Sequence, residues 1–240
     1  MWSPLREGPP PHQLALQRRG SKAVLPPVSI VWPCSLSVDE YVAAGRAVEV
    51  PRPNCPGCLE LMIFWSGYRR QIREGGRCSQ MWVPRVRCEV CSVSHALLPA
   101  FVVNNRLDVA ESIGAVLDEV SDSSAGVRPA AEQQGIPHTT ARGWVRRFAE
   151  RSADLAVAFA ALAIDLGGEV ATLSTPPLDA KCHALAAIRA LWRAASGLPG
   201  WLGCGRWRFI SSITGGSFVA TNTNSPYLFV GKRRFMPPVP

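Results

Sequence analysis

Hydrophobic positions follow two different periods along the chain, and the change falls near residue 105. Before it, short β-prone runs occur at 28–32 and on both sides of the sequence REGGR, whose paired glycines indicate a tight turn. From Leu107 onward, apolar residues recur three and four positions apart, which is typical of amphipathic helices. The pattern predicts an α+β protein, in which a small β-rich part around one hairpin is followed by a mainly helical part.

Capping signals place the expected helices. Ser37 followed by Glu40 forms a capping-box pattern for a short helix over 37–45, and Asp108 followed by Glu111 indicates the start of a second helix. The remaining helices are expected over 129–134, 138–151, 153–166 and 179–196.

The chain shows no segment suited to a membrane or to secretion. The longest apolar window, 153–166, is shorter than the roughly 20 residues that span a bilayer, and it contains Asp154 and Asp165. The first residues lack the apolar stretch of a secretion signal. We therefore expect a cytoplasmic protein without membrane contact, whose cysteines remain thiols.

Two pairs of cysteines have the spacing of zinc ligands. Cys55 and Cys58 precede the expected hairpin, Cys88 and Cys91 follow it, and each pair encloses two residues. A pair with this spacing turns tightly enough to present two thiolates to one tetrahedral Zn²⁺. Because four thiolates leave no position for water, the predicted cofactor is a structural Zn²⁺ in a zinc-ribbon-like domain.

Other interpretations of these cysteines stay open. Four independent buried thiols would give the same sequence, whereas a thioredoxin-like redox pair lacks its surrounding βαβ pattern. His95 is expected to pack in the protein or contact phosphate, with a role as ligand or ligand neighbour as the alternative.

The net charge of +8 favours a partner that carries phosphate. Arginines concentrate in two places, 66–91 and 142–151, with few acidic residues beside them. In the first group, the residues expected to contact phosphate are Arg69, Arg70 and Arg73.

The second arginine group lies in a stretch with the spacing of a helix-turn-helix. Small Ala131 lets two helices approach closely, and Gly135 supplies the turn between them. The apolar positions of the second helix leave one side free to face the major groove of double-stranded DNA. That side carries His138, Thr139, Arg142, Gly143, Arg146 and Arg147. A plain helical hairpin with a solvated arginine face is the alternative.

These motifs divide the chain into five parts. They are a disordered lead at 1–27, a zinc-ribbon-like domain at 28–104, a helix-turn-helix domain at 105–151, a helical extension at 152–199 and a turn-rich tail of unclear fold at 200–240.

Taken in order, the segments IVWP, PRPNCPGC, FWSGY, RVRCEVCSVSHALLPAF and PHTTARGWVRRF resemble a family of uncharacterised actinobacterial proteins. The resemblance covers about residues 28–151. It implies a zinc ribbon joined to a helix-turn-helix, similar to the DNA-binding regions of transposases.

The acidic residues after Arg151 are too few, and too poorly patterned, for the metal site of a transposase. We therefore expect a non-catalytic, sequence-specific, nucleoid-associated DNA-binding protein, either a transposon-associated accessory factor or a transcriptional regulator. A transposase or another protein is a possible second partner. The alternatives are a zinc-stapled protein adaptor and the DNA-binding half of a split transposase.

Overall fold

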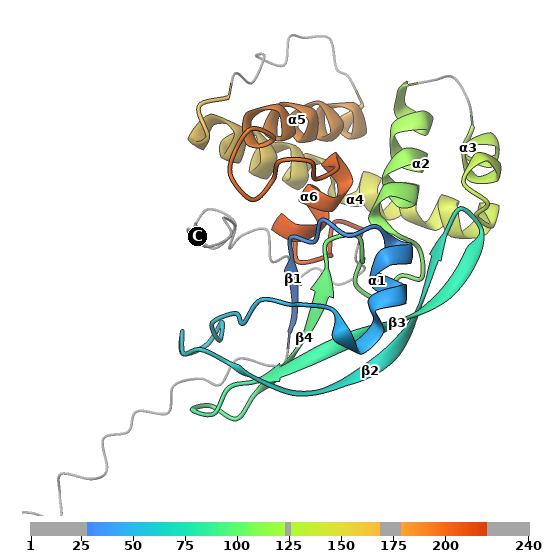
Figure 1. Cartoon of the computed structure of the whole chain (residues 1–240). Coiled ribbons are helices and arrows are strands. Elements are labelled where there is room, and N and C mark those ends of the chain that lie inside the picture. The colour runs from blue at the N-terminus through green and yellow to red at the C-terminus, as the bar shows by residue number, and fades with distance from the viewer. Residues whose placement is uncertain (1–27, 123–125, 169–178, 220–240) are drawn as a thin grey trace, which may run out of the picture.

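A computed structural model describes residues 28–122, 126–168 and 179–219 of the protein. Within them a four-stranded sheet is followed by a layer of helices, which confirms the predicted α+β class (Figure 1). The predicted lead at 1–27 and the end of the chain from 220 lie outside the described residues.

The sheet has the strand order β1-β4-β3-β2, and its main feature is a long hairpin. Strands β2 and β3 pair antiparallel from Ile63 opposite Arg87 to Glu74 opposite Arg77, with one bulge at Trp65. Gly75 and Gly76 both have positive φ in the connecting turn, which confirms the turn predicted at REGGR. The strands are β1 (Ser29–Trp32), β2 (Ile63–Glu74), β3 (Arg77–Arg87) and β4 (Ser94–Pro99).

Helix α1 (Val38–Ala44) begins with the predicted capping box. The Ser37 hydroxyl accepts a hydrogen bond from the Glu40 backbone N–H, and the Glu40 carboxylate accepts one from the Ser37 N–H. The short 3-10 helix η2 (Gly45–Ala47) follows. Val38 and Tyr41 are buried in one hydrophobic cluster with residues of β2 and β3, so α1 covers part of the hairpin.

The helical layer packs around a single hydrophobic core that includes buried residues from Ala110 to Val219. In Figure 1 these helices gather on one side of the sheet, and α5 runs alongside α4. They are α2 (Ala110–Asp122), α3 (Val127–Gln133), α4 (His138–Asp165), α5 (Ala180–Ala195) and α6 (Arg206–Ile213).

Three details differ from the sequence-based expectation. The helices expected over 138–151 and 153–166 are one continuous helix of 28 residues, α4, because neither glycine nor proline separates them at 151–153. The boundary predicted at 151 therefore falls inside a helix. Asp108 does not cap α2, since its carboxylate binds Arg73 instead. The tail expected to be turn-rich contains α6.

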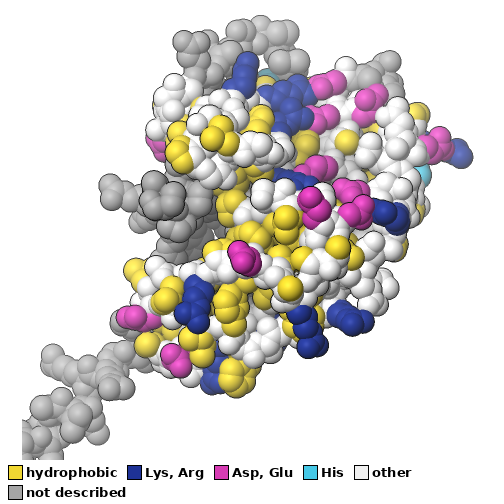
Figure 2. Space-filling view, in the orientation of Figure 1, with side chains coloured by type: hydrophobic (Ala, Val, Ile, Leu, Met, Phe, Trp, Pro, Cys, Tyr) yellow, Lys and Arg dark blue, Asp and Glu magenta, His cyan; other side chains and the backbone are white. Residues whose placement is uncertain are grey.

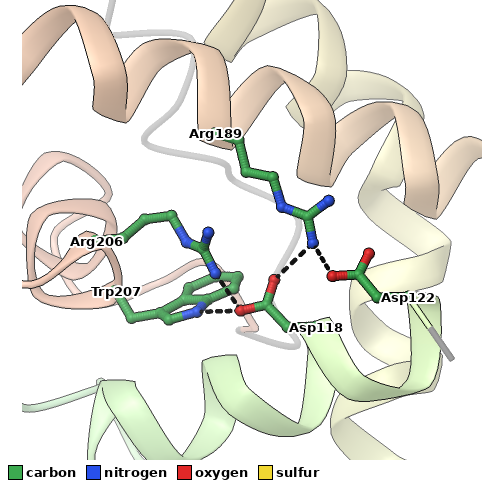
Figure 3. A network of polar contacts seen from close by, with 5 residues as sticks. All are labelled: Asp118, Asp122, Arg189, Arg206 and Trp207. Carbon is green, nitrogen blue, oxygen red and sulfur yellow. Dashed lines mark hydrogen bonds and ion pairs between the residues drawn. The ribbon is translucent and has the colours of Figure 1, made fainter.

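An ionic network holds α2, α5 and α6 together, and Asp118 is at its centre (Figure 3). The Asp118 carboxylate accepts hydrogen bonds from Arg189 on α5 at 3.3 Å and from the Trp207 indole on α6 at 2.9 Å. Arg206 also binds Asp118, and Arg189 binds Asp122 as well. Each guanidinium of this network has a carboxylate partner, so the positive charges of Arg189 and Arg206 are neutralised. Arginines without a carboxylate partner among the described residues lie in other parts of the molecule.

No helix within the described ranges is long and apolar enough to cross a membrane.

Candidate functional site

The four predicted zinc ligands converge at one end of the hairpin. Their Sγ atoms all lie within 4.8 Å of one another. Cys55 Sγ is 3.6 Å from Cys91 Sγ, and Cys58 Sγ is 3.2 Å from Cys88 Sγ. Four sulfurs bound tetrahedrally at about 2.3 Å from Zn²⁺ would be about 3.8 Å apart. The arrangement therefore fits a metal ion held by four thiolates.

Both cysteine turns have the same local conformation. Leu59 directly follows the second cysteine of its pair, as Ser92 does in the other, and both have positive φ, at 64° and 60°. In the first turn the Leu59 N–H donates to the Cys55 carbonyl at 2.8 Å. In the second, the Cys88 N–H donates to the Val93 carbonyl at 2.9 Å. The turn at each pair therefore directs both of its Sγ atoms toward the centre of the four-cysteine cluster.

Hydrogen bonds between the cysteine thiols shift their pKa values. Burial alone would raise the pKa of Cys88, but hydrogen bonds from the backbone N–H of Cys91 and from Cys58 lower it to about 7. The hydrogen bond to Cys88 raises the pKa of Cys58 to about 12. A thiolate at Cys88 is therefore accessible near neutral pH, and thiolates are the form that binds zinc.

The metal-binding end has little hydrophobic core of its own. Its buried cluster comprises two of the cysteines with only Met62, Val86 and Leu97. Such a small cluster cannot fix a long hairpin end by burial alone, so bound metal would supply the missing free energy of folding.

His95 packs in the protein and lies outside the cysteine cluster. It is 1% exposed, its Nδ1 accepts a hydrogen bond from the Val28 N–H at 3.3 Å, and burial lowers its pKa. This confirms the expectation that it packs, and burial excludes the phosphate contact. Cys34, Cys78, Cys182 and Cys204 also lie outside the cluster.

At the other end of the hairpin is a basic cleft of about 630 Å³, between the 105–108 loop and the first half of α4. It contains five of the six residues predicted on the DNA-facing side of α4, all except His138, together with Arg73 from β2. Its lining residues are Arg73, Asn105, Arg106, Leu107, Asp108, Thr139, Thr140, Arg142, Gly143, Trp144, Arg146 and Arg147.

Three arginines of the cleft have no carboxylate partner among the described residues. Arg73 is neutralised by Asp108, at 2.6 Å between Nε and Oδ1, and exposed Arg146 lies 3.6 Å from Glu150. The unpaired ones are Arg106, Arg142 and Arg147.

The unpaired charge of the cleft is partly buried. The Nε atoms of Arg106 and Arg147 are shielded from solvent and have no hydrogen-bond partner in the described part of the chain. Burial, and then the positive charge of Arg147, lower the pKa of Arg106. Burying like charges side by side costs free energy, which an anion in the cleft would recover.

The predicted side of α4 lies outside the hydrophobic core. Ala141, Trp144 and Phe148 are buried, while His138, Thr139, Arg142 and Arg146 are exposed. Arg147 folds over Gly143, with Nη1 only 3.0 Å from where a Cβ would stand.

The three arginines predicted on β2 have different environments. Arg69 is exposed. Arg70 donates hydrogen bonds to the backbone carbonyls of Val103 and Arg106, and Arg73 binds Asp108. Arg70 and Arg73 thus hold the loop that forms one wall of the cleft, and we leave them out of the proposed contact surface.

Arg106 was missed by sequence reasoning. It is more than 30 residues from the α4 arginines, in a loop without periodicity, and no spacing motif connects the two segments. The sequence NNR at 104–106 indicates a polar turn, and nothing in it predicts that Arg106 lies beside α4.

The turn between α3 and α4 rests against the tip of the hairpin. Gly135 has a φ of 62°, and a Cβ built there would stand 3.0 Å from the Cα and N of Gly76. Two glycine turns from distant parts of the sequence therefore meet, and the lack of a side chain at Gly135 allows the close approach.

Residues 55–144 match the model of a family described as a domain of unknown function, DUF6431. This segment begins at the first cysteine of the metal centre and ends in the first half of α4, so it includes both the cysteine cluster and part of the cleft. No curated protein and no solved structure matches the chain.

The purified chain is expected to hold one Zn²⁺, which elemental analysis measures directly. Cys58→Ser should lose the metal and lower the midpoint of urea unfolding, because three thiolates leave the turn unclosed. Cys78→Ser, at an exposed cysteine outside the cluster, is the matched control. An unchanged metal content in Cys58→Ser would exclude the four-cysteine site.

Gly135→Val should destabilise the protein by about 2 kcal/mol, because a β-branched residue fits poorly at positive φ and its Cβ meets the hairpin tip. Chemical denaturation measures the change. Gly197→Ala serves as control, since open space surrounds that glycine. If the two variants are equally stable, the two turns are not packed as described.

Proposed function

We propose that this protein is a sequence-specific, non-catalytic DNA-binding protein that holds a duplex in the basic cleft. In this proposal α3, the Gly135 turn and the start of α4 form a helix-turn-helix, and the cysteine centre is a structural zinc site. The observation that carries the proposal is the unpaired positive charge of Arg106, Arg142 and Arg147 around one open cleft.

The ligand of such a cleft must be an anion, and the shape favours a polymer. A volume of about 630 Å³ exceeds what one phosphate needs, and exposed side chains continue from the cleft along α4. Exposed Arg142 and Arg146 lie four residues apart, about 6 Å along the helix, on the same side of it. This spacing suits contacts with neighbouring base edges or phosphates in a major groove.

The two kinds of arginine have different predicted roles. Arg142 is exposed at the start of α4 and is placed to read a base, most favourably guanine through O6 and N7. Arg106 is partly buried in the wall of the cleft, where its guanidinium donates to the Asn105 and Val219 carbonyls but has no carboxylate partner among the residues that the structure describes. Its charge fits a phosphate, since phosphate contacts fix register without reading sequence.

The test begins with selection of bound sequences from a random duplex library by the zinc-loaded protein. Titration of the selected duplex should show Arg142→Ala weaker by about 1–3 kcal/mol and less selective. Arg106→Gln should weaken selected and random duplexes alike and lower the salt slope by about one unit.

Arg193→Ala, at an exposed arginine of α5 away from the cleft, is the matched control and should bind like the parent. If all four proteins bind every duplex equally, the cleft is not a DNA site.

A second candidate function has an observation of its own. Val157 and Ile164 are 72% and 62% exposed on the second half of α4, two turns apart on one side of the helix. A protein adaptor would use such a surface. Absence of duplex retention, together with capture of a transposase or regulator that Val157→Asp abolishes, would favour this function.

A further inference from the structure

A second surface combines exposed aromatic rings with arginines, and it lies near the cysteine centre, away from the cleft. We define it as the hairpin patch: Trp65, Tyr68, Arg85 and Arg87. Trp65 is 58% exposed and Tyr68 is 41% exposed, which is unusual for large aromatic side chains that contribute to no core.

The strand register places these residues on one face of the hairpin. Val83, Arg85 and Arg87 alternate along β3 and therefore share a face, and Tyr68 is the partner of Val83 on β2. Val83 itself is buried in the cluster that includes Val38 and Tyr41 of α1, whereas Arg85 and Arg87 are half-buried. Trp65 occupies the bulge, and its ring centroid is 4.8 Å from the Arg87 guanidinium carbon. The arginine covers one face of the indole, and the large exposure of Trp65 leaves the other accessible.

The patch is positively charged. Between 63 and 87 the only acidic residue is Glu74, which lies at the far end of the hairpin. Glu60 and Glu89, in the cysteine turns, are the nearest acids in sequence. Neither Arg85 nor Arg87 forms an ion pair with a carboxylate in the described ranges. In Figure 2 most acidic side chains gather over α2, whereas over the sheet basic and hydrophobic side chains are interspersed with a few acidic ones.

The chemistry of the patch identifies its ligand. Ring faces accept flat, apolar groups, and unpaired guanidiniums beside them accept phosphates. A single-stranded nucleic acid offers both along one chain, because its bases are free to stack on aromatic side chains. A duplex offers phosphates only, since its bases already stack on one another.

We propose that the hairpin patch binds single-stranded nucleic acid, with Trp65 and Tyr68 as stacking platforms and Arg85 and Arg87 as phosphate contacts. This inference stands apart from the proposed function. The patch and the cleft lie at opposite ends of the same hairpin and share no residue. A protein with both surfaces would engage a duplex next to an unpaired stretch.

The experiment uses the full, zinc-loaded chain and fluorescently labelled 15-nucleotide oligo-dT and oligo-U, followed by anisotropy. Trp65→Ala should bind either oligonucleotide about 5- to 150-fold more weakly, the range of losing one base–aromatic stack. Trp65→Phe should recover most of the affinity, since it retains a ring. Arg87→Gln should weaken binding and lower its salt dependence.

Leu202→Ala, at a residue 72% exposed on another part of the surface, is the control and should bind like the parent. Metal content and melting temperature confirm that each variant is folded. Trp65→Ala should bind the duplex like the parent, whereas Arg142→Ala should bind the duplex more weakly and the oligonucleotides like the parent. The two proposals can therefore fail separately.

Equal oligonucleotide binding by the parent and Trp65→Ala would overturn the inference. So would a parent that binds no oligonucleotide but forms a dimer that Trp65→Ala dissociates, because β2 is the edge strand of the sheet and the patch would then pair two copies.

Discussion

The β2–β3 hairpin connects every feature that bears on function. Its strands, 12 and 11 residues long, extend about 35 Å, with the cysteine cluster at one end and the α3–α4 turn against the other. The cysteine end has little core of its own, whereas the other end contributes Ile72 and Met81 to a larger cluster and rests on another turn at its tip. Four sulfurs supply one support, and close packing of Gly76 against Gly135 supplies the other. Along its length, Arg70 and Arg73 bind the loop that shapes the cleft.

The distribution of charge follows from the same arrangement. Acidic residues of α2 form ion pairs with arginines of α5 and α6 in the network around Asp118, and Asp108 forms one with Arg73. The cleft and the hairpin patch consequently retain arginines without partners. We infer that, within the described ranges, arginines are paired with carboxylates where the helices pack together and are unpaired at the two surfaces that anions can reach.

The sequence predicted the features that depend on local spacing. The two cysteine pairs, the glycine turn of the hairpin and the capping box at Ser37 each follow from a few neighbouring residues, and the structure contains all three. The cleft could not be predicted completely, because Arg106 reaches it from a loop that only tertiary packing brings beside α4. Arg70 and Arg73 looked like surface charges, since nothing local showed that Val103 and Asp108 would fold against them. The break expected in α4 at Ser152 is absent: neither glycine nor proline interrupts the chain there, and the Ser152 hydroxyl donates to the Phe148 carbonyl within the helix.

We propose that the cleft between the 105–108 loop and α4 holds double-stranded DNA. Hydrogen–deuterium exchange of the zinc-loaded chain, with and without a 30-base-pair duplex at low salt, tests it most directly. We predict slower exchange on DNA addition in two separate segments, 103–108 and 138–147, with α5 unchanged. Bound duplex that leaves both segments unprotected would contradict the claim.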